Sequence, residues 1–455
     1  MLLGPFDKRR KRSRFNIIPS APEIVHAPGH IRIGNAASSS RKAARQASAS
    51  LCKSKIHLQS HLVTSPRSEQ TSYFFQYFDT FLKHNNFNPG SVFSTDVVHL
   101  MKDQRAGTFL LDAVLSLGAM QAAKLGSFEG LTPSHSYQAA VHYYSKSVLG
   151  LRHALSEFEH VSGAQHGILW ATHLLGLFEL MNDPTGQGWI QHLVHGTSKA
   201  LVAAGPSSCQ SGLGQRFFAE IRIFEVCRAI IFNEPTFLAD SEWTRLAVEM
   251  LSANDKDETR SLHELLDIVV LCSTLRVRAS NLVYSLSGSG IENFEKHLDD
   301  AYDISQQGFH LRQALLGWGA RNETYKTLVS ATADKDFGLL VRAFFSATSI
   351  YLSGVFDYEI MHWQEMGIVI PNLSEDEIQM HVAAILTQTN MMLNGSSVSP
   401  LLVLFPLRVA GARSCKNWQQ DCILEQLAVI DRTFPVASAF RVELGKVWAR
   451  RTCGG

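Results

Sequence analysis

The segment "DDAYD" carries three carboxylates whose spacing suits metal-assisted chemistry. On a helix, residues three or four positions apart lie on one face, so Asp299 and Asp303 would point the same way, with Asp300 beside them. Magnesium prefers oxygen ligands and is commonly held by one or two carboxylates together with substrate phosphates. The segment therefore has the residue types needed to hold a magnesium ion against a diphosphate.

The spacing of these three aspartates is similar to that of the magnesium-binding carboxylates in class I terpene synthases. That chemistry also needs a second metal motif of the form N-D-x-x-S-x-x-x-E farther along the chain, and the segment "SAFRVELGKVW" does not supply it. We therefore interpret the acidic segment as a solvated helix face and predict that the chain is not an enzyme. A helical, magnesium-dependent enzyme of the terpene-synthase type stays an alternative function.

Three other patterns fall short of a catalytic or ligand-binding motif. His192 and His195 in "HLVH" lack both a third metal ligand and a general-base glutamate. The run Gly288, Ser289, Gly290 is shorter than the G-x-S-x-G turn that exposes a nucleophilic serine. The segment "GLGQRF" lacks the spaced glycines and the Lys-Ser/Thr pair of a phosphate-binding loop. We predict no catalytic, cofactor-binding or metal-ligating residue.

A basic run near the start, "DKRRKRSRF", places six cations among nine residues. The cations are Lys8, Arg9, Arg10, Lys11, Arg12 and Arg14. Short runs of this kind are typical of nuclear import signals and of patches that contact phosphate. Contact with DNA through the run alone would be weak and salt-sensitive, because phosphate contacts carry no sequence information. We predict an import signal with incidental phosphate affinity, and a solvated tail is the alternative.

The charge of the chain is divided unevenly along its length. Residues 1–70 contain thirteen Lys and Arg against three acidic residues, a net charge of +10, whereas the whole chain carries only +1. The remaining residues therefore carry −9. Residues 1–70 are also rich in Ser and Ala and lack the large apolar residues that a core requires. We predict a disordered basic arm at 1–70 and a folded region at 72–450.

Cysteine usage and hydropathy exclude several classes of protein. The seven cysteines are scattered and contain no C-x-x-C pair, which indicates reduced thiols rather than a disulfide framework or a zinc site. The start "MLLGPFDKRR" has its cations after a very short apolar stretch, the reverse of a secretory signal. No uninterrupted apolar run reaches the roughly 18 residues of a membrane span, so we expect no membrane association.

Apolar residues recur at helical spacing from residue 72 onward. The predicted helical segments are 72–82, 108–125, 134–158, 163–181, 188–205, 214–232, 261–280, 290–319, 337–363, 375–393 and 421–434. No sustained period-two alternation with hairpin turns appears, which argues against a sheet. The sequence predicts an all-α fold of stacked antiparallel helices, and we expect "SGSG" at 287–290 to be a loop within one helical domain.

Three segments stand in this order along the chain: "YQAAVHYYSKSVLGLRHAL", "LWATHLLGLFELM" and "GWIQHLVHGTSKALVAAGP". In the first segment the pattern consists of Ala139, Tyr143, Tyr144, Leu149, Leu151 and Arg152. In the third segment it consists of Trp189, His192, Gly196, Leu201, Gly205 and Pro206. These segments resemble the fungal-specific transcription factor domain, the large all-helical regulatory domain that accompanies zinc binuclear cluster regulators.

Four later segments are similar to segments found in the same order in that family: "FFAEIRIFEVCRAI", "FLADSEW", "ATSIYLSGVFD" and "LLVLFPLRVAGARS". The resemblance covers residues 72–450 or thereabouts. It implies a nuclear transcription regulator that controls a metabolic or secondary-metabolite gene cluster. It also implies partners: other transcription proteins, a homo- or heterodimer, a small-molecule effector, and DNA reached weakly or indirectly. A metabolite- or partner-binding protein with no DNA role is a further alternative.

The chain departs from the family pattern at its start. Members typically begin with six cysteines that hold two zinc ions and present a helix to the major groove. Residues 1–70 contain only Cys52, so this cluster is absent from them. Three explanations stay open: regulation through partners, DNA contact by the basic arm, or a truncated gene model.

Overall fold

A computed structural model describes residues 66–88, 93–102, 107–126, 132–156, 165–253, 257–286, 294–328 and 335–452. The six cations of the basic run and the loop at 287–290 lie outside these residues. The described residues form seventeen α-helices and no β-strand. A single pair, Asn86 and Val398, makes an isolated parallel bridge within them. The predicted all-α fold is confirmed.

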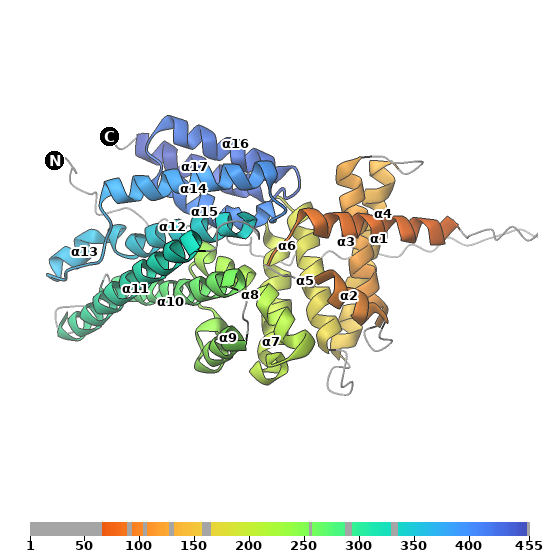
Figure 1. Cartoon of the computed structure of the whole chain (residues 1–455), viewed down its shortest axis with the longest axis horizontal. Coiled ribbons are helices and arrows are strands. Elements are labelled where there is room, and N and C mark those ends of the chain that lie inside the picture. The colour runs from red at the N-terminus through yellow and green to blue at the C-terminus, as the bar shows by residue number, and fades with distance from the viewer. Residues whose placement is uncertain are drawn as a thin grey trace, which may run out of the picture.

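The first helices form one packed group, on the right of Figure 1. They are α1 (Pro66–His84), α2 (Phe93–Lys102), α3 (Gly107–Leu125), α4 (Pro133–Ser156) and α5 (Gln165–Asn182). The middle helix of the group is α3, which contacts α1, α4 and α5. All but one of residues 109–122 are buried for this reason. The apolar composition that α3 shows all round its axis is the signature of a helix covered on every side.

The chain then passes through the centre of the molecule. A short helix, α6 (Gln187–Ile190), leads into a π-helical segment, η2 (Gln191–Ser198), and then α7 (Lys199–Ala204). The next helix, α8 (Gly212–Phe232), contacts α5 on one side and α10 and α15 on the other, so it joins the two halves of the molecule. After it comes α9 (Ser241–Ala253).

The second half contains two layers of helices, on the left of Figure 1. One layer is α10 (Asp257–Leu286) and α11 (Phe294–Leu328), with α12 (Lys335–Asp357) packed against both. Trp318 of α11 stacks on Phe345 of α12 at 5.5 Å between ring centroids. This ring pair fixes the contact between the two long helices.

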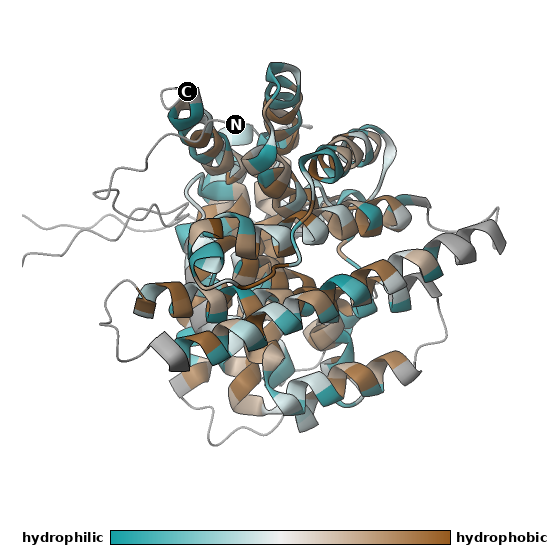
Figure 2. Cartoon of the chain, turned by 90° about the vertical axis from the view of Figure 1, so that its left-hand side faces the viewer, coloured by the Kyte–Doolittle hydropathy of each residue, from teal (hydrophilic) through white to brown (hydrophobic). Residues whose placement is uncertain are grey.

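The other layer contains the last helices of the chain, preceded by the short α13 (Ile360–Glu365). They are α14 (Glu375–Gly395), α15 (Leu404–Arg413), α16 (Asn417–Asp431) and α17 (Ala437–Thr452). A capping box between Ser374 and Glu377 starts α14. Figure 2 shows apolar residues gathered in the interior and hydrophilic residues on the outward faces of the outer helices.

The helical segments predicted from periodicity are present, with two kinds of difference. Four helices, α2, α9, α15 and α17, were not among the predicted segments. Helices α2 and α15 have only ten residues each, and α17 is weakly amphipathic, whereas the amphipathic α9 was overlooked. The segment predicted to run to residue 363 breaks at Asp357. There Ser353 Oγ donates to Asp357 at 2.6 Å and Arg413 binds the same carboxylate, so Asp357 ends α12 by facing another helix.

Two helices have the length and hydropathy of a membrane span, Thr108–Leu125 and Asp336–Asp357. Within them, 72% and 78% of the residues are buried against the rest of the protein. Their apolar character is therefore used in helix packing.

A polar staple joins the end of α1 to the segment between α14 and α15. Asn86 N–H donates to Ser397 O at 2.9 Å, and Ser399 N–H donates back to Asn86 O at 2.9 Å. The buried Ser399 hydroxyl also donates to Asn85 Oδ1 at 2.9 Å, across 314 positions of sequence. These bonds hold the end of α1 against the segment that precedes α15.

Candidate functional site

The acidic segment lies near the start of α11 and faces solvent. Asp299 and Asp300 are exposed, and Asp303 is bound by Arg278 of α10 at 2.8 Å. Gln307 Nε2 also donates to Asp303, at 3.1 Å. Asp303 is thus used to join α10 to α11, and across the described ranges no three His, Cys, Asp or Glu side chains come close enough to hold a metal ion. This placement agrees with the interpretation of a solvated helix face.

The histidines of "HLVH" lie on the π-helical segment η2. His192 Nε2 lies 2.8 Å from the Tyr144 hydroxyl of α4, and the side chain of His195 lies outside the described part of the structure. Tyr144 also hydrogen-bonds Glu179 of α5. Because the hydroxyl donates to the Glu179 carboxylate, His192 Nε2–H is left to donate to the hydroxyl oxygen. Tyr144 therefore links three helical segments.

Burial dominates the acid–base properties of this cluster. It lowers the pKa of His192 to about 4. It also raises the pKa of Glu179, although the hydrogen bond from Tyr144 opposes the shift. Helix α6, which leads into the π-helical segment, approaches α5 closely because Gly188 has no side chain, and a Cβ there would lie 2.4 Å from Glu179 Oε2. Helical periodicity did not predict this π-helical segment, which packs against α5.

A second polar cluster surrounds Arg222 on α8, whose side chain is only 1% exposed. Its guanidinium binds Asp267 of α10 and donates to His263 Nδ1 at 3.0 Å. Since arginine can only donate, Nδ1 of His263 is the acceptor and its proton lies on Nε2. Desolvation lowers the pKa of Arg222 and raises the pKa of Asp267, each against their mutual attraction.

A third cluster surrounds Arg228 and Glu225, one turn apart on α8. Arg228 binds both oxygens of Glu225, through Nη2 at 2.7 Å and Nε at 3.1 Å. Ser198 at the end of η2 and Thr236 after α8 also donate to Glu225, at 3.0 and 2.9 Å. Arg228 further binds Glu234 at 2.8 Å. The buried carboxylate of Glu225 thus accepts hydrogen bonds from residues before, within and after α8.

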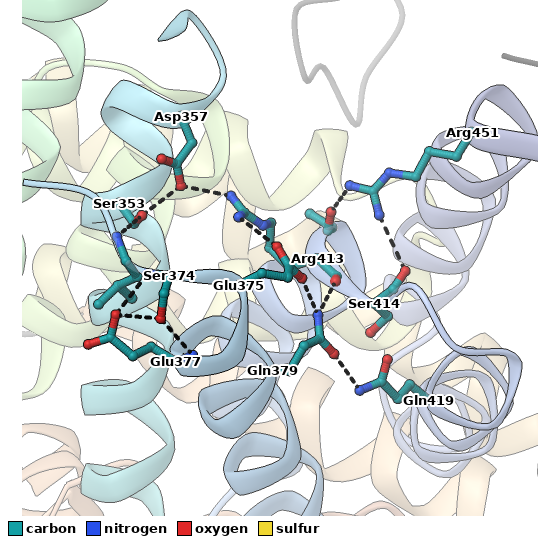
Figure 3. A network of polar contacts seen from close by, with 12 residues as sticks. Ser353, Asp357, Ser374, Glu375, Glu377, Gln379, Arg413, Ser414, Gln419 and Arg451 are labelled. Carbon is teal, nitrogen blue, oxygen red and sulfur yellow. Dashed lines mark hydrogen bonds and ion pairs between the residues drawn. The ribbon is translucent and has the colours of Figure 1, made fainter. Parts of the chain in front are cut away.

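Figure 3 shows a fourth polar network, among the last helices. Arg413 at the end of α15 binds Asp357 of α12 at 3.1 Å and lies 3.7 Å from Glu375 at the start of α14. Gln379 of α14 accepts from Gln419 of α16 at 2.9 Å. Polar side chains thus fix the ends of four helices relative to one another.

At four of these places an arginine pairs with an acid. Arg278, Arg222, Arg228 and Arg413 each hold an acid on the same or a neighbouring helix. Such an arrangement holds the helices in fixed positions relative to one another. The sequence did not single out Arg222 or Arg228, because both sit in an apolar helical pattern.

Comparison with known families identifies the family to which this helical domain belongs. The family model for the fungal specific transcription factor domain matches residues 59–455. The chain belongs to this family. The resemblance inferred from the motifs is therefore confirmed, and the chain belongs to a family of transcription regulators.

The chain is similar to "Uncharacterized protein AN5342" from Emericella nidulans. The two are 26% identical over 120 residues, which are 26% of this chain and 25% of the relative. The match thus spans about a quarter of the relative's length. No solved structure matches the chain.

The motif residues of the fungal transcription factor domain have packing roles in the structure. Tyr143 of α4 meets Phe74 of α1 edge to face, with ring centroids 6.2 Å apart. Leu201 of α7 is fully buried, and Gly205 ends α7 with a φ of 75° that favours glycine. Gly196 lies against Thr172 of α5. The motif thus describes how α4 to α7 pack together.

We expect Arg228→Met to lower the free energy of unfolding by about 3–5 kcal/mol, because it leaves Glu225 buried without its cation. The double variant Arg228→Met, Glu225→Leu should recover much of this loss. Arg245→Met is the matched control, since Arg245 and Glu249 form an exposed pair at 3.7 Å whose loss costs about 1 kcal/mol or less. Urea unfolding measures all three. Equal losses for Arg228→Met and Arg245→Met would contradict the assignment.

The stability of the fold should decrease in mild acid because of His173 on α5. Burial among Trp170, Phe217 and Phe224 lowers the pKa of His173 to about 3. Below about pH 6.5 the unfolded chain gains a proton at this position that the folded chain does not, which lowers the free energy of unfolding by up to about 1.4 kcal/mol per pH unit.

His173→Gln should remove this contribution. The free energy of unfolding should then depend less steeply on pH between pH 6.5 and 4, by the same amount per pH unit. Denaturant unfolding at several pH values measures the slope. His310→Gln, at an exposed position on α11, is the control for the loss of an imidazole. A slope that His173→Gln leaves unchanged would show that His173 accepts a proton in the folded state.

Proposed function

We propose that the chain is a nuclear transcription regulator that controls a metabolic or secondary-metabolite gene cluster. The observation that carries the proposal is the match to the fungal specific transcription factor domain over residues 59–455. The network of buried ion pairs around α8 supports it, because this network holds helices in place and leaves the outer surface available to partners. The basic arm supplies import into the nucleus.

The proposed route to DNA is indirect. Residues 1–70 contain one cysteine, so they do not encode the six-cysteine zinc cluster that typically reads the major groove in this family. The cations of the arm contact phosphates, which adds affinity without selecting a sequence. Other transcription proteins, or a second copy or related chain in a dimer, would then determine the target site. A small-molecule effector would set the activity.

A reporter assay tests the regulatory function. We expect the full chain, fused to a DNA-binding domain of known site, to change transcription from a reporter that carries this site by several-fold. The DNA-binding domain alone and its fusion to residues 1–65 are the controls, because neither carries the helical domain. A fusion that accumulates in the nucleus and leaves the reporter unchanged would refute the proposal.

A localisation assay tests the role of the arm. Replacing Lys8, Arg9, Arg10, Lys11, Arg12 and Arg14 by Gln should move a fluorescently tagged chain from the nucleus to the cytoplasm. The matched control replaces the six other cations of residues 1–65 by Gln, namely Arg32, Arg41, Lys42, Arg45, Lys53 and Lys55. Both variants lose six positive charges. If both lose nuclear localisation equally, total charge and not the run is responsible.

A further inference from the structure

A cavity of about 260 Å³ lies where the end of α1 meets the end of α14 and the end of α16. Its walls come from the ends of α1, α14 and α16 and from the segment that links α14 to α15. The polar staple between Asn86 and residues Ser397 and Ser399 lies beside it and holds these walls together. The cavity therefore exists only in the folded chain.

The floor of the cavity is apolar. Met392 and Val398 are each 3% exposed, and Val403 is fully buried. Val429 of α16 lies at the rim and is 39% exposed. An aliphatic group placed in the cavity would leave water and contact these four side chains, which is the main source of affinity in small binding sites.

The rim of the cavity carries positive charge and hydrogen-bond donors. Arg432 is exposed at the end of α16, and among the described residues its guanidinium has neither a salt bridge nor a hydrogen bond. Thr433 supplies a hydroxyl beside it. His84 Nδ1 donates to Thr80 O at 2.8 Å, so Nε2 of the neutral ring is an acceptor and the donors at the rim are Arg432 and Thr433. Arginine is the side chain best suited to bind a carboxylate, because two of its N–H groups can reach both oxygens.

None of the described residues that line the cavity is acidic. Two acids lie near its walls, and both act on other groups. Asp336 accepts from the backbone N–H of Ser397 at 3.1 Å. Asp431, next to Arg432 in the chain, attracts Lys124 on α3 and so opposes the desolvation that lowers the pKa of this lysine. The charge that faces a ligand at the rim is therefore positive.

We propose that this cavity binds a short aliphatic carboxylic acid, with the chain on the apolar floor and the carboxylate at Arg432 and Thr433. The volume lies below the roughly 300–1,000 Å³ of sites for drug-sized ligands, so the ligand is a small metabolite. This inference rests on the proposed function, because it names the chemical class of the small-molecule effector. Binding itself is a property of the purified chain and is measured without transcription.

Calorimetric titration of the full chain with hexanoate tests the proposal. We expect one saturable site, and affinity that rises about fourfold per CH₂ from butanoate to hexanoate. The uncharged analogue 1-hexanol should bind at least fivefold more weakly than hexanoate. Absence of saturation by hexanoate, or equal binding of acid and alcohol, would overturn the proposal.

Two variants with matched controls locate the site. Arg432→Gln should weaken the binding of hexanoate at least fivefold and leave the binding of 1-hexanol unchanged. Arg441→Gln, on α17 and outside the cavity lining, should change the binding of neither compound. Val429→Trp should fill the mouth and abolish binding, whereas Val442→Trp, 59% exposed on α17, should not. Thermal melting verifies that each variant is folded. Equal effects of a variant and its control would place the ligand elsewhere.

A chain that binds hexanoate but leaves the reporter unchanged would support the binding site and refute the regulatory function. A chain that regulates the reporter but binds no short acid would refute the site alone. The two proposals are therefore separable.

Discussion

The burial of two arginines on one central helix is the constraint on which the rest of the structure depends. An unpaired charge inside a protein is very costly, so Arg222 and Arg228 require partners in fixed positions. These partners are Asp267 on α10, Glu225 on α8 itself, and Glu234 just after it. Because Ser198 from η2 also binds Glu225, the segments on both sides of α8 are held to one register.

This constraint links the two halves of the molecule. Apolar packing alone would allow α8 to slide or rotate against α5 and α10, since dispersion and hydrophobic contacts have little direction. Hydrogen bonds to a charged group are directional and strong, so they select one arrangement. The staple between Asn85 and Ser399 and the network around Arg413 act in the same way in the C-terminal half. A scaffold fixed at these points presents surfaces of constant shape to partners and ligands.

Much of the fold could be predicted from periodicity and motif order. The long buried helix α3 and the helix α8 were anticipated within a few residues, because apolar residues on every side indicate a covered helix. Short helices such as α2 and α9 were missed, and the end of α12 was placed six residues too late. That end depends on Arg413, which lies 56 positions away along the chain. In the acidic segment, Asp299 and Asp300 are exposed as a solvated face would be, whereas the pairing of Asp303 with Arg278 depends on the packing of α10 against α11.

The sequence by itself determined the helical architecture, the family and the separation of positive charge into an N-terminal arm. These properties are set by residues close together in the chain, since helical periodicity joins positions three and four apart and motifs are read in order. Only the tertiary structure decided which acids neutralise Arg222 and Arg228, where the π-helical segment contacts Tyr144, and which residues enclose the cavity at Arg432. Most of these partners lie tens to hundreds of positions apart, and only packing of the whole chain brings them within hydrogen-bond distance.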